Sequence, residues 1–137
     1  MSGLLFLVCL GLASCASAGG PRLVDGRLLP CPDSPNCVCS EQPNPGIEPL
    51  ALEDAGWDRL VETVTALGGS VEQEADGYVH ATFRSHFFGF IDDLECRRDG
   101  NLVHIRSAAR SGWWDMGVNR RRVERLRAAL SAAGQSR

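Results

Sequence analysis

Two Asp-Gly pairs, at residues 76–77 and 99–100, constrain the fold of this 137-residue chain more than any other feature. Asp-Gly is a preferred two-residue turn between antiparallel strands. Four segments with the composition of strands flank the two pairs: 70–74, 78–85, 87–98 and 102–108. In the second of these, Val79, Ala81 and Phe83 fall on one face, as in a strand with one buried side. The sequence therefore predicts a four-stranded antiparallel meander.

Two stretches with helical spacing enclose the strand segments. The first carries an apolar stripe that stops at Gly68-Gly69: Trp57, Leu60, Val61, Val64 and Leu67. The second carries an apolar stripe that ends near Gly134: Val123, Leu126 and Leu130. Either Asp115 or Asn119 supplies a short side-chain acceptor to cap the first turn of this second helix. The order helix, four strands, helix predicts an α+β fold with both helices packed on one face of the sheet.

Residues 4–12 form an uninterrupted apolar run close to the N-terminus. The run is too short for a bilayer, which needs about 20 apolar residues, but it matches the hydrophobic region of a secretory signal. The following LASC, residues 12–15, resembles the lipobox of bacterial lipoproteins, although no Lys or Arg precedes the apolar run. We therefore expect residues 1–14 to be a signal peptide and Cys15 to be lipidated. An ordinary cleaved signal ending near residues 16–18 and a retained cytosolic chain are the alternatives.

The N-terminal segment also predicts the domain organisation and the location of the protein. Residues 15–29 are expected to be a lipid-anchored N-terminus and flexible tether, residues 30–134 a single domain and residues 135–137 a tail. The predicted partner is a membrane, reached through the lipid anchor. Ala16 replaces the aspartate that often marks inner-membrane lipoproteins, which favours the periplasmic side of the outer membrane. An exported protein with a net charge of −3 is not expected to meet nucleic acid.

Four cysteines lie beyond the predicted lipidation site: Cys31, Cys37, Cys39 and Cys96. An even number of cysteines in an oxidising compartment favours disulfides. Three connectivities are possible, and the one with a strained bond between Cys37 and Cys39 is disfavoured. Of the other two we favour Cys31–Cys37, which closes a short loop around the turn-forming PDSPN, together with Cys39–Cys96. A metal site built from the first three cysteines is the alternative. It lacks the paired CxxC units or regularly spaced histidines of zinc sites, so we predict neither a metal nor another cofactor.

Three ordered motifs make the chain recognisable. They are CPDSPNCVCS at residues 31–40, FGFIDDLE at residues 88–95 and IRSAARSGWWDMGVNRRRVERLR at residues 105–127. Together they resemble the bacterial family catalogued as domain of unknown function 1499, from residue 29 to about residue 130. The resemblance implies a small exported or membrane-attached protein to which no activity is assigned.

The resemblance also identifies a set of polar residues. The family's recurrent polar positions fall on Asn36, Asp92, Asp93, Arg106, Ser107, Arg110, Asp115, Asn119 and Arg120. The chain departs from the family at Cys39, where serine is expected, and at Cys96, where an apolar residue is expected. Trp114 replaces a smaller residue. We expect Trp113 or Trp114 to cover the core.

Charge is divided unevenly along the chain. Residues 1–105 contain six arginines and fifteen acidic residues, a net charge of −9, whereas residues 106–137 contain eight arginines and two acidic residues, a net charge of +6. A guanidinium binds a carboxylate through two parallel hydrogen bonds. We therefore expect Arg106 to pair with Asp92 or Asp93 on the neighbouring strand and to brace the turn before the last helix.

Three functions are compatible with this polar cluster. The first is a structural brace, and the second is a binding site in which Arg106, Arg110 and Arg120 hold an anionic group such as a lipid headgroup, an envelope polymer or a carboxylate. The third is a hydrolase-like site in which Asp92 or Asp93 acts as a base beside Arg106 and Arg110. Neighbouring side chains on a strand point to opposite faces, so the two aspartates do not form a catalytic pair unless a bulge re-aims one.

No nucleophile with an adjacent histidine and acid is readable in the sequence, so no catalytic residue is predicted. The sequence therefore predicts an exported cell-envelope lipoprotein with a non-catalytic binding or structural domain.

Overall fold

The computed structural model describes residues 21–44, 46–52 and 56–134. The predicted signal peptide, residues 1–14, and the predicted lipidation site Cys15 lie outside the described residues. In chain order the elements are β1 (Leu23–Val24), β2 (Arg27–Leu28), β3 (Cys37–Cys39), β4 (Leu50–Ala51), α1 (Gly56–Ala66), β5 (Ser70–Ala75), β6 (Tyr78–Arg84), β7 (Ile91–Asp99), β8 (Leu102–Ala109) and α2 (Val118–Gly134). No helix in these ranges has the length and apolar character needed to cross a membrane.

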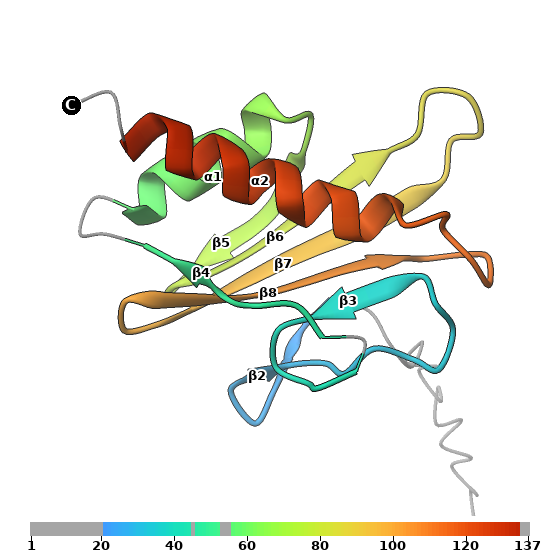
Figure 1. The fold of residues 1–137 in the computed structure, drawn as a ribbon, viewed down its shortest axis with the longest axis horizontal. Helices are drawn as coiled ribbons and strands as arrows, with labels where there is room; N and C mark the ends of the chain where they lie inside the picture. The colour runs from blue at the N-terminus through green and yellow to red at the C-terminus, as the bar shows by residue number, and fades with distance from the viewer. Residues whose placement is uncertain (1–20, 45, 53–55, 135–137) are drawn as a thin grey trace, which may run out of the picture.

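The main sheet is antiparallel and has six strands, in the order β3-β8-β7-β6-β5, with β4 also paired to β8 (Figure 1). The predicted meander β5-β6-β7-β8 is present, but the predicted sheet of four strands was too small. β3 and β4 share the outer edge of β8, where they pair with residues 106–108 and 102–103. These two strands have three residues and two residues, too few to produce an alternating pattern in the sequence.

Both Asp-Gly pairs lie at hairpin turns, but in different registers. Asp76 and Gly77 are the two central residues of the first turn, and both have positive φ, as a type I′ turn requires. Asp99 is the last residue of β7, so the second turn is centred on Gly100 and Asn101. Only Gly100 of this pair has positive φ, which fits a turn with glycine at its first central position.

Both helices cover the same face of the sheet and bury the main hydrophobic core beneath them (Figure 1). Leu60 and Val64 of α1 meet Val123 and Leu126 of α2, and all four side chains are fully buried. The sheet contributes one residue in two along its strands: Val38, Leu50, Val79, Ala81, Leu94, Cys96, Val103 and Ile105. These apolar residues follow the helical and alternating spacings that the sequence shows.

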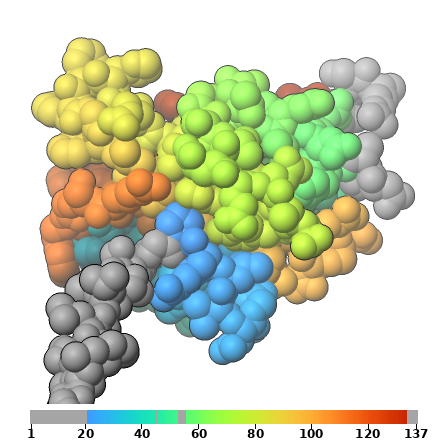
Figure 2. All heavy atoms as spheres, turned by 180° about the vertical axis from the view of Figure 1, so that it is seen from behind, coloured from blue at the N-terminus to red at the C-terminus, as the bar shows by residue number. Residues whose placement is uncertain are grey.

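The opposite face of the sheet has no helix, and the β1–β2 hairpin packs against part of it (Figure 2, residues 21–28 in blue). Leu28 is buried there against Cys39 and Tyr78. The backbone N–H of Arg22 donates to Glu95 at 2.9 Å. We expected a flexible tether that extends to residue 29. In the structure, residues 21–29 instead pack on the domain. A hairpin this short gives no periodic signal that separates it from a flexible segment.

Candidate functional site

The nine polar residues singled out by the sequence do not form one cluster. Strand alternation sends Asp92 and Ser107 to the helix-covered face of the sheet, and Asp93, Arg106 and Arg110 to the opposite face. Two separate groups of interactions result, one on each face. We call them the helix-side network and the open-face network.

In the open-face network, Arg106 of β8 pairs with Glu95 of β7. The two residues are direct cross-strand neighbours, and Arg106 Nη1 donates to Glu95 Oε2 at 3.0 Å. Glu95 is fully buried and also accepts from the Tyr78 hydroxyl at 2.8 Å. The expectation that Arg106 pairs with Asp92 or Asp93 was wrong, because the strand register, which the sequence leaves open, places Glu95 opposite Arg106. Burial and the adjacent Glu95 raise the pKa of Tyr78.

Asp93 is the second anion of the open-face network. It accepts two parallel hydrogen bonds from Arg110, both at 2.8 Å, and lies 2.7 Å from Nε2 of His80. Burial raises the pKa of Asp93, but the hydrogen bonds from His80 and Arg110 outweigh burial and lower it to about 2. Asp93 is therefore ionised and fully occupied by partners from its own chain.

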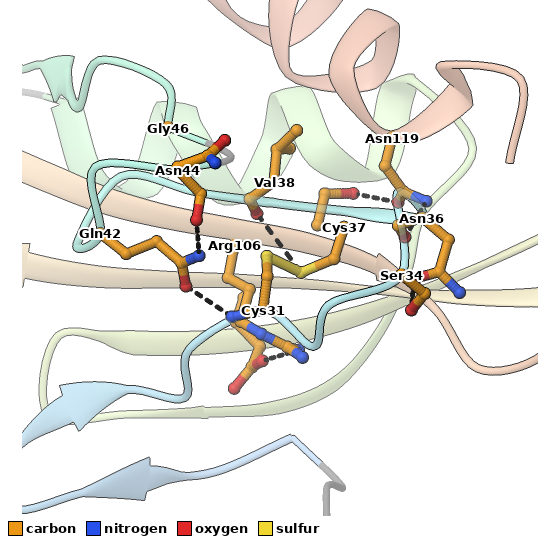
Figure 3. Close-up of a disulfide and its surroundings, with 12 residues drawn as sticks. Cys31, Ser34, Asn36, Cys37, Val38, Gln42, Asn44, Gly46, Arg106 and Asn119 are labelled. Atoms are coloured by element: carbon orange, nitrogen blue, oxygen red, sulfur yellow. Dashed lines mark hydrogen bonds and ion pairs between the residues drawn. A yellow bond between two sulfur atoms is a disulfide. The ribbon is translucent and has the colours of Figure 1, made fainter. Parts of the chain in front are cut away.

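The helix-side network is centred on Asn119, whose side chain is fully buried at the start of α2. Its carboxamide oxygen accepts from the Ser107 hydroxyl at 2.6 Å and from Arg122 at 2.6 Å. Its amide nitrogen donates to the Asn36 carbonyl at 3.2 Å and to Asp115 at 2.8 Å. Figure 3 shows Asn119 facing Asn36 next to the disulfide loop. Asn119 thus ties α2 to β8 and to the segment before β3.

Asp92 joins the helix-side network through Arg122, whose Nη2 donates to it at 2.7 Å. The same guanidinium lies over the Phe83 ring, 4.5 Å from its centroid. The sequence did not single out Arg122, because it is one of three consecutive arginines and nothing in the sequence distinguishes the buried one. The helical position relative to the core residue Val123 also does not show which of Arg121 and Arg122 is the buried arginine.

Asp115 caps α2, one of the two alternatives that the sequence left open. Its carboxylate accepts from the backbone N–H groups of Gly117 and Asn119, both at 2.9 Å. Burial raises the pKa of Asp115, and the hydrogen bonds from Asn119 and Gly117 lower it overall. Met116 and Gly117, between the cap and the helix, both have positive φ, so the chain turns sharply into α2.

Arg120 belongs to neither network. It is exposed and donates to the carbonyl of Gly46 at 3.2 Å, beside an open cavity of about 720 Å³ that His104 and Arg27 also line. Arg106 and Arg110 are not among the residues that line this cavity. The three arginines of the expected anion site do not meet at one site: Arg106 and Arg110 pair with acids on the open face of the sheet, whereas Arg120 lies beside this cavity.

One of the two expected disulfides is confirmed. Cys31 and Cys37 are bonded, with their Cα atoms 5.6 Å apart (Figure 3). Cys39 and Cys96 are free and buried, so the expected Cys39–Cys96 bond was wrong. They lie on opposite faces of the sheet, Cys39 against the β1–β2 hairpin and Cys96 in the main core, and β8 separates their strands. Burial raises the pKa of both thiols.

The described ranges contain no group of three or more His, Cys, Asp or Glu side chains placed to hold a metal ion. Of the three cysteines in the alternative metal site, Cys31 and Cys37 are bonded to each other and only Cys39 is a free thiol.

The largest feature that the sequence reasoning missed is a group of exposed apolar side chains at one end of the domain. We call this group the aromatic end; its members, with their exposed fractions, are Phe87 94%, Phe88 78%, Phe90 56%, Trp113 69%, Trp114 67% and Met116 65%. The expectation that Trp113 or Trp114 covers the core was wrong, and residues 87–90 are a loop rather than the start of a strand. The sequence signal that these apolar residues lie in loops is the neighbouring glycines, Gly89 and Gly112. Both glycines have positive φ in the structure.

Comparison with known proteins gives a family but no characterised relative. No curated protein and no solved structure shows significant similarity to the chain. A family profile described as "Protein of unknown function (DUF1499)" matches residues 27–130, which include both polar networks and the aromatic end. The chain therefore belongs to the DUF1499 family.

Proposed function

We propose that the protein is an exported, lipid-anchored protein of the bacterial cell envelope whose α+β domain is a non-catalytic binding or structural module. Residues 1–14 are the signal peptide, and Cys15 carries the lipid that holds the domain at a membrane. The LASC motif supports the anchor, and Ala16 supports the periplasmic side of the outer membrane.

The pairing of the carboxylates supports a non-catalytic domain. A general acid or base needs a pKa near the working pH and a position within reach of substrate. The side chain of Asp93 is 8% exposed and its pKa is about 2, because His80 and Arg110 hold the ionised form. Asp92 forms an ion pair with Arg122 at 2.7 Å, and its side chain is 13% exposed. These groups are placed to brace the sheet and the start of α2.

A hydrolase-like site using Asp92 or Asp93 is the alternative. The 2.7 Å contact between His80 and Asp93 is the arrangement that comes nearest to an acid–base pair. However, His80 is only 8% exposed, and the same Asp93 oxygen also accepts from Arg110. Asp92 lies on the other face of the sheet, so the two aspartates do not meet. The geometry therefore favours the brace.

The anchor is tested by growing cells that produce the full chain with an alkyne-labelled fatty acid and separating membranes from soluble proteins. Wild type should be labelled and recovered with membranes, and Cys15→Ser should lose the label. Cys9→Ser is the matched control, because Cys9 lies in the predicted signal peptide and its loss should leave labelling unchanged. Wild-type protein without label in the soluble fraction would refute the proposal.

A further inference from the structure

The two loops that form the aromatic end leave the sheet side by side. The loop 85–90 leads into β7 and the loop 110–117 follows β8, and the backbone N–H of Arg110 donates to the Ile91 carbonyl at 3.0 Å. Figures 1 and 2 show the two loops at the same end of the molecule, yellow and orange. Phe88 and Phe90 stack with their ring centroids 5.6 Å apart. Monomeric proteins rarely expose such a patch unless it binds something.

The residue types at this surface suit a membrane interface. Tryptophan is enriched at the level of lipid headgroups, because its ring is apolar while its N–H still finds a polar partner. Trp113 and Trp114 stand together on one loop, and Phe87 and Phe88 together on the other. These aromatic side chains are already exposed on their loops, so they can insert at the boundary between headgroups and acyl chains without any change in the fold.

The charge around the aromatic end is positive. Asp93 and Asp92 neutralise Arg110 and Arg122, so residues 84–93 and 110–125 are counted together: they carry six arginines and four acidic residues, a net charge of +2 on a chain whose total is −3. Two exposed arginines fold back onto the loops themselves, Arg84 to the Gly89 carbonyl and Arg121 to the Met116 carbonyl. Anionic lipid attracts exposed arginines that lie near the membrane surface.

A small cavity of about 190 Å³ adjoins the aromatic end at the first turns of α2. Three arginines and three apolar side chains line it: Arg121, Arg122, Arg125, Leu67, Phe83 and Val118. No carboxylate is among the lining residues, since Asp92 lies behind Arg122 and is paired with it. A cavity with cationic and apolar walls fits the phosphate and the glycerol end of a phospholipid.

The predicted anchor is within reach of this surface. Arg22 contacts Glu95, which lies four residues along β7 from Ile91 at the aromatic end, a distance of about 14 Å along a strand. Cys15 lies seven positions before Arg22 in the sequence, and a chain of that length spans up to roughly 25 Å. A lipid on Cys15 and the aromatic end can therefore enter the same leaflet.

We infer that the aromatic end docks on the bilayer itself, with its loops in the interface and Arg121 and Arg125 against anionic phospholipid phosphates. This inference rests on the proposed function, because the lipid anchor holds the domain next to the membrane on which it docks. It also predicts how the domain is oriented on the membrane: the start of α2 lies at the bilayer surface, and the Asp76-Gly77 turn lies at the opposite end of the domain.

The three tryptophans of the chain allow a direct test. Trp57→Phe leaves only Trp113 and Trp114, whereas a Trp113→Phe, Trp114→Phe double variant leaves only Trp57. Trp57 is a matched control, because its indole donates to Glu74 at the far end of β5. The full chain is added to vesicles of phosphatidylethanolamine and phosphatidylglycerol that contain brominated lipid, and tryptophan emission is recorded.

We expect the fluorescence of Trp113 and Trp114 to shift to the blue and to be quenched by the brominated lipid, while Trp57 is unaffected. Unquenched Trp113 and Trp114 in vesicles that carry the lipidated protein would overturn the docking inference and leave the anchor intact. The unlipidated Cys15→Ser chain, tested in the same way, isolates docking from anchoring. If wild type is never lipidated in cells but this chain is still quenched, the proposed anchor fails and docking stands.

The lipid charge is tested with Arg121→Gln, Arg125→Gln and with vesicles of phosphatidylcholine alone. Quenching should weaken in the double variant, in uncharged vesicles and at high salt, because salt screens exposed charges. Equal quenching under all three conditions would overturn the role of the arginines. Phe87→Ser, Phe88→Ser should lose quenching while keeping the thermal stability of wild type, since both side chains are exposed.

Discussion

Arg106 and Glu95 form an ion pair across neighbouring strands, 3.0 Å apart, with 7% and 0% of their side chains exposed. Removing one partner leaves an uncompensated buried charge, which costs about 3 to 5 kcal/mol. We therefore expect Arg106→Gln to lower the free energy of unfolding by that amount in a urea titration. Arg120→Gln is the control and should change stability by no more than about 0.5 kcal/mol, because Arg120 is exposed. Equal stabilities for the two variants would contradict a structural brace.

Asp93 should make stability depend on acid pH. Its pKa is lowered to about 2, so its contribution is complete above the unfolded-state value of about 4 and is lost as the pH falls towards 2. The wild-type free energy of unfolding should fall by about 2 kcal/mol from this group over that range. Asp93→Asn should be less stable at pH 7 and should show a shallower pH dependence below pH 4. An unchanged slope would show that Asp93 is not held in its ionised form.

Cys39 and Cys96 should be unreactive in the folded protein. Burial raises the pKa of both thiols, and the thiolate is the reactive form. Iodoacetamide at pH 8 should leave both cysteines unmodified in native protein and modify both in guanidinium chloride, as read by peptide mass spectrometry. A peptide cross-linked between Cys39 and Cys96 in oxidised protein would contradict their placement on opposite faces of the sheet.

Asp115 should stabilise α2 as its cap. Its carboxylate accepts from the backbone of Gly117 and Asn119, and loss of a helix cap costs about 1 kcal/mol. Asp115→Ala should lower the midpoint of urea unfolding accordingly, and Ser111→Ala, at an exposed position on the same loop, should not. A loss of stability in both variants would point to the loop as a whole rather than to the cap.

The meander and both helices were predictable because their signals are local. Asp-Gly pairs fix hairpin turns, and the apolar stripes of α1 and α2 mark the sides that face the sheet. β3 and β4 were not predictable, because strands of two or three residues are held by their pairing with β8 rather than by their own pattern. The β1–β2 hairpin was missed for the same reason.

The polar residues were predictable as a set but not in their pairing. Strand alternation separates Asp92 from Asp93 without any knowledge of the register. The partner of Arg106 depends on the register of β7 against β8, and a shift of two residues would have placed a different acid opposite it. Whether Trp113 and Trp114 are exposed depends on where their loop leaves the sheet. The local sequence pattern does not indicate that position.

The Cys31–Cys37 bond links the redox state of the surroundings to the aromatic end of the domain. It closes the loop that carries Asn36, and Asn36 donates to the Gly112 carbonyl while its own carbonyl accepts from Asn119. Such bonds persist in oxidising surroundings, so a reducing agent removes the covalent closure of this loop. Reduction of the bond would therefore weaken the hold of Asn36 on the tryptophan loop and on the start of α2.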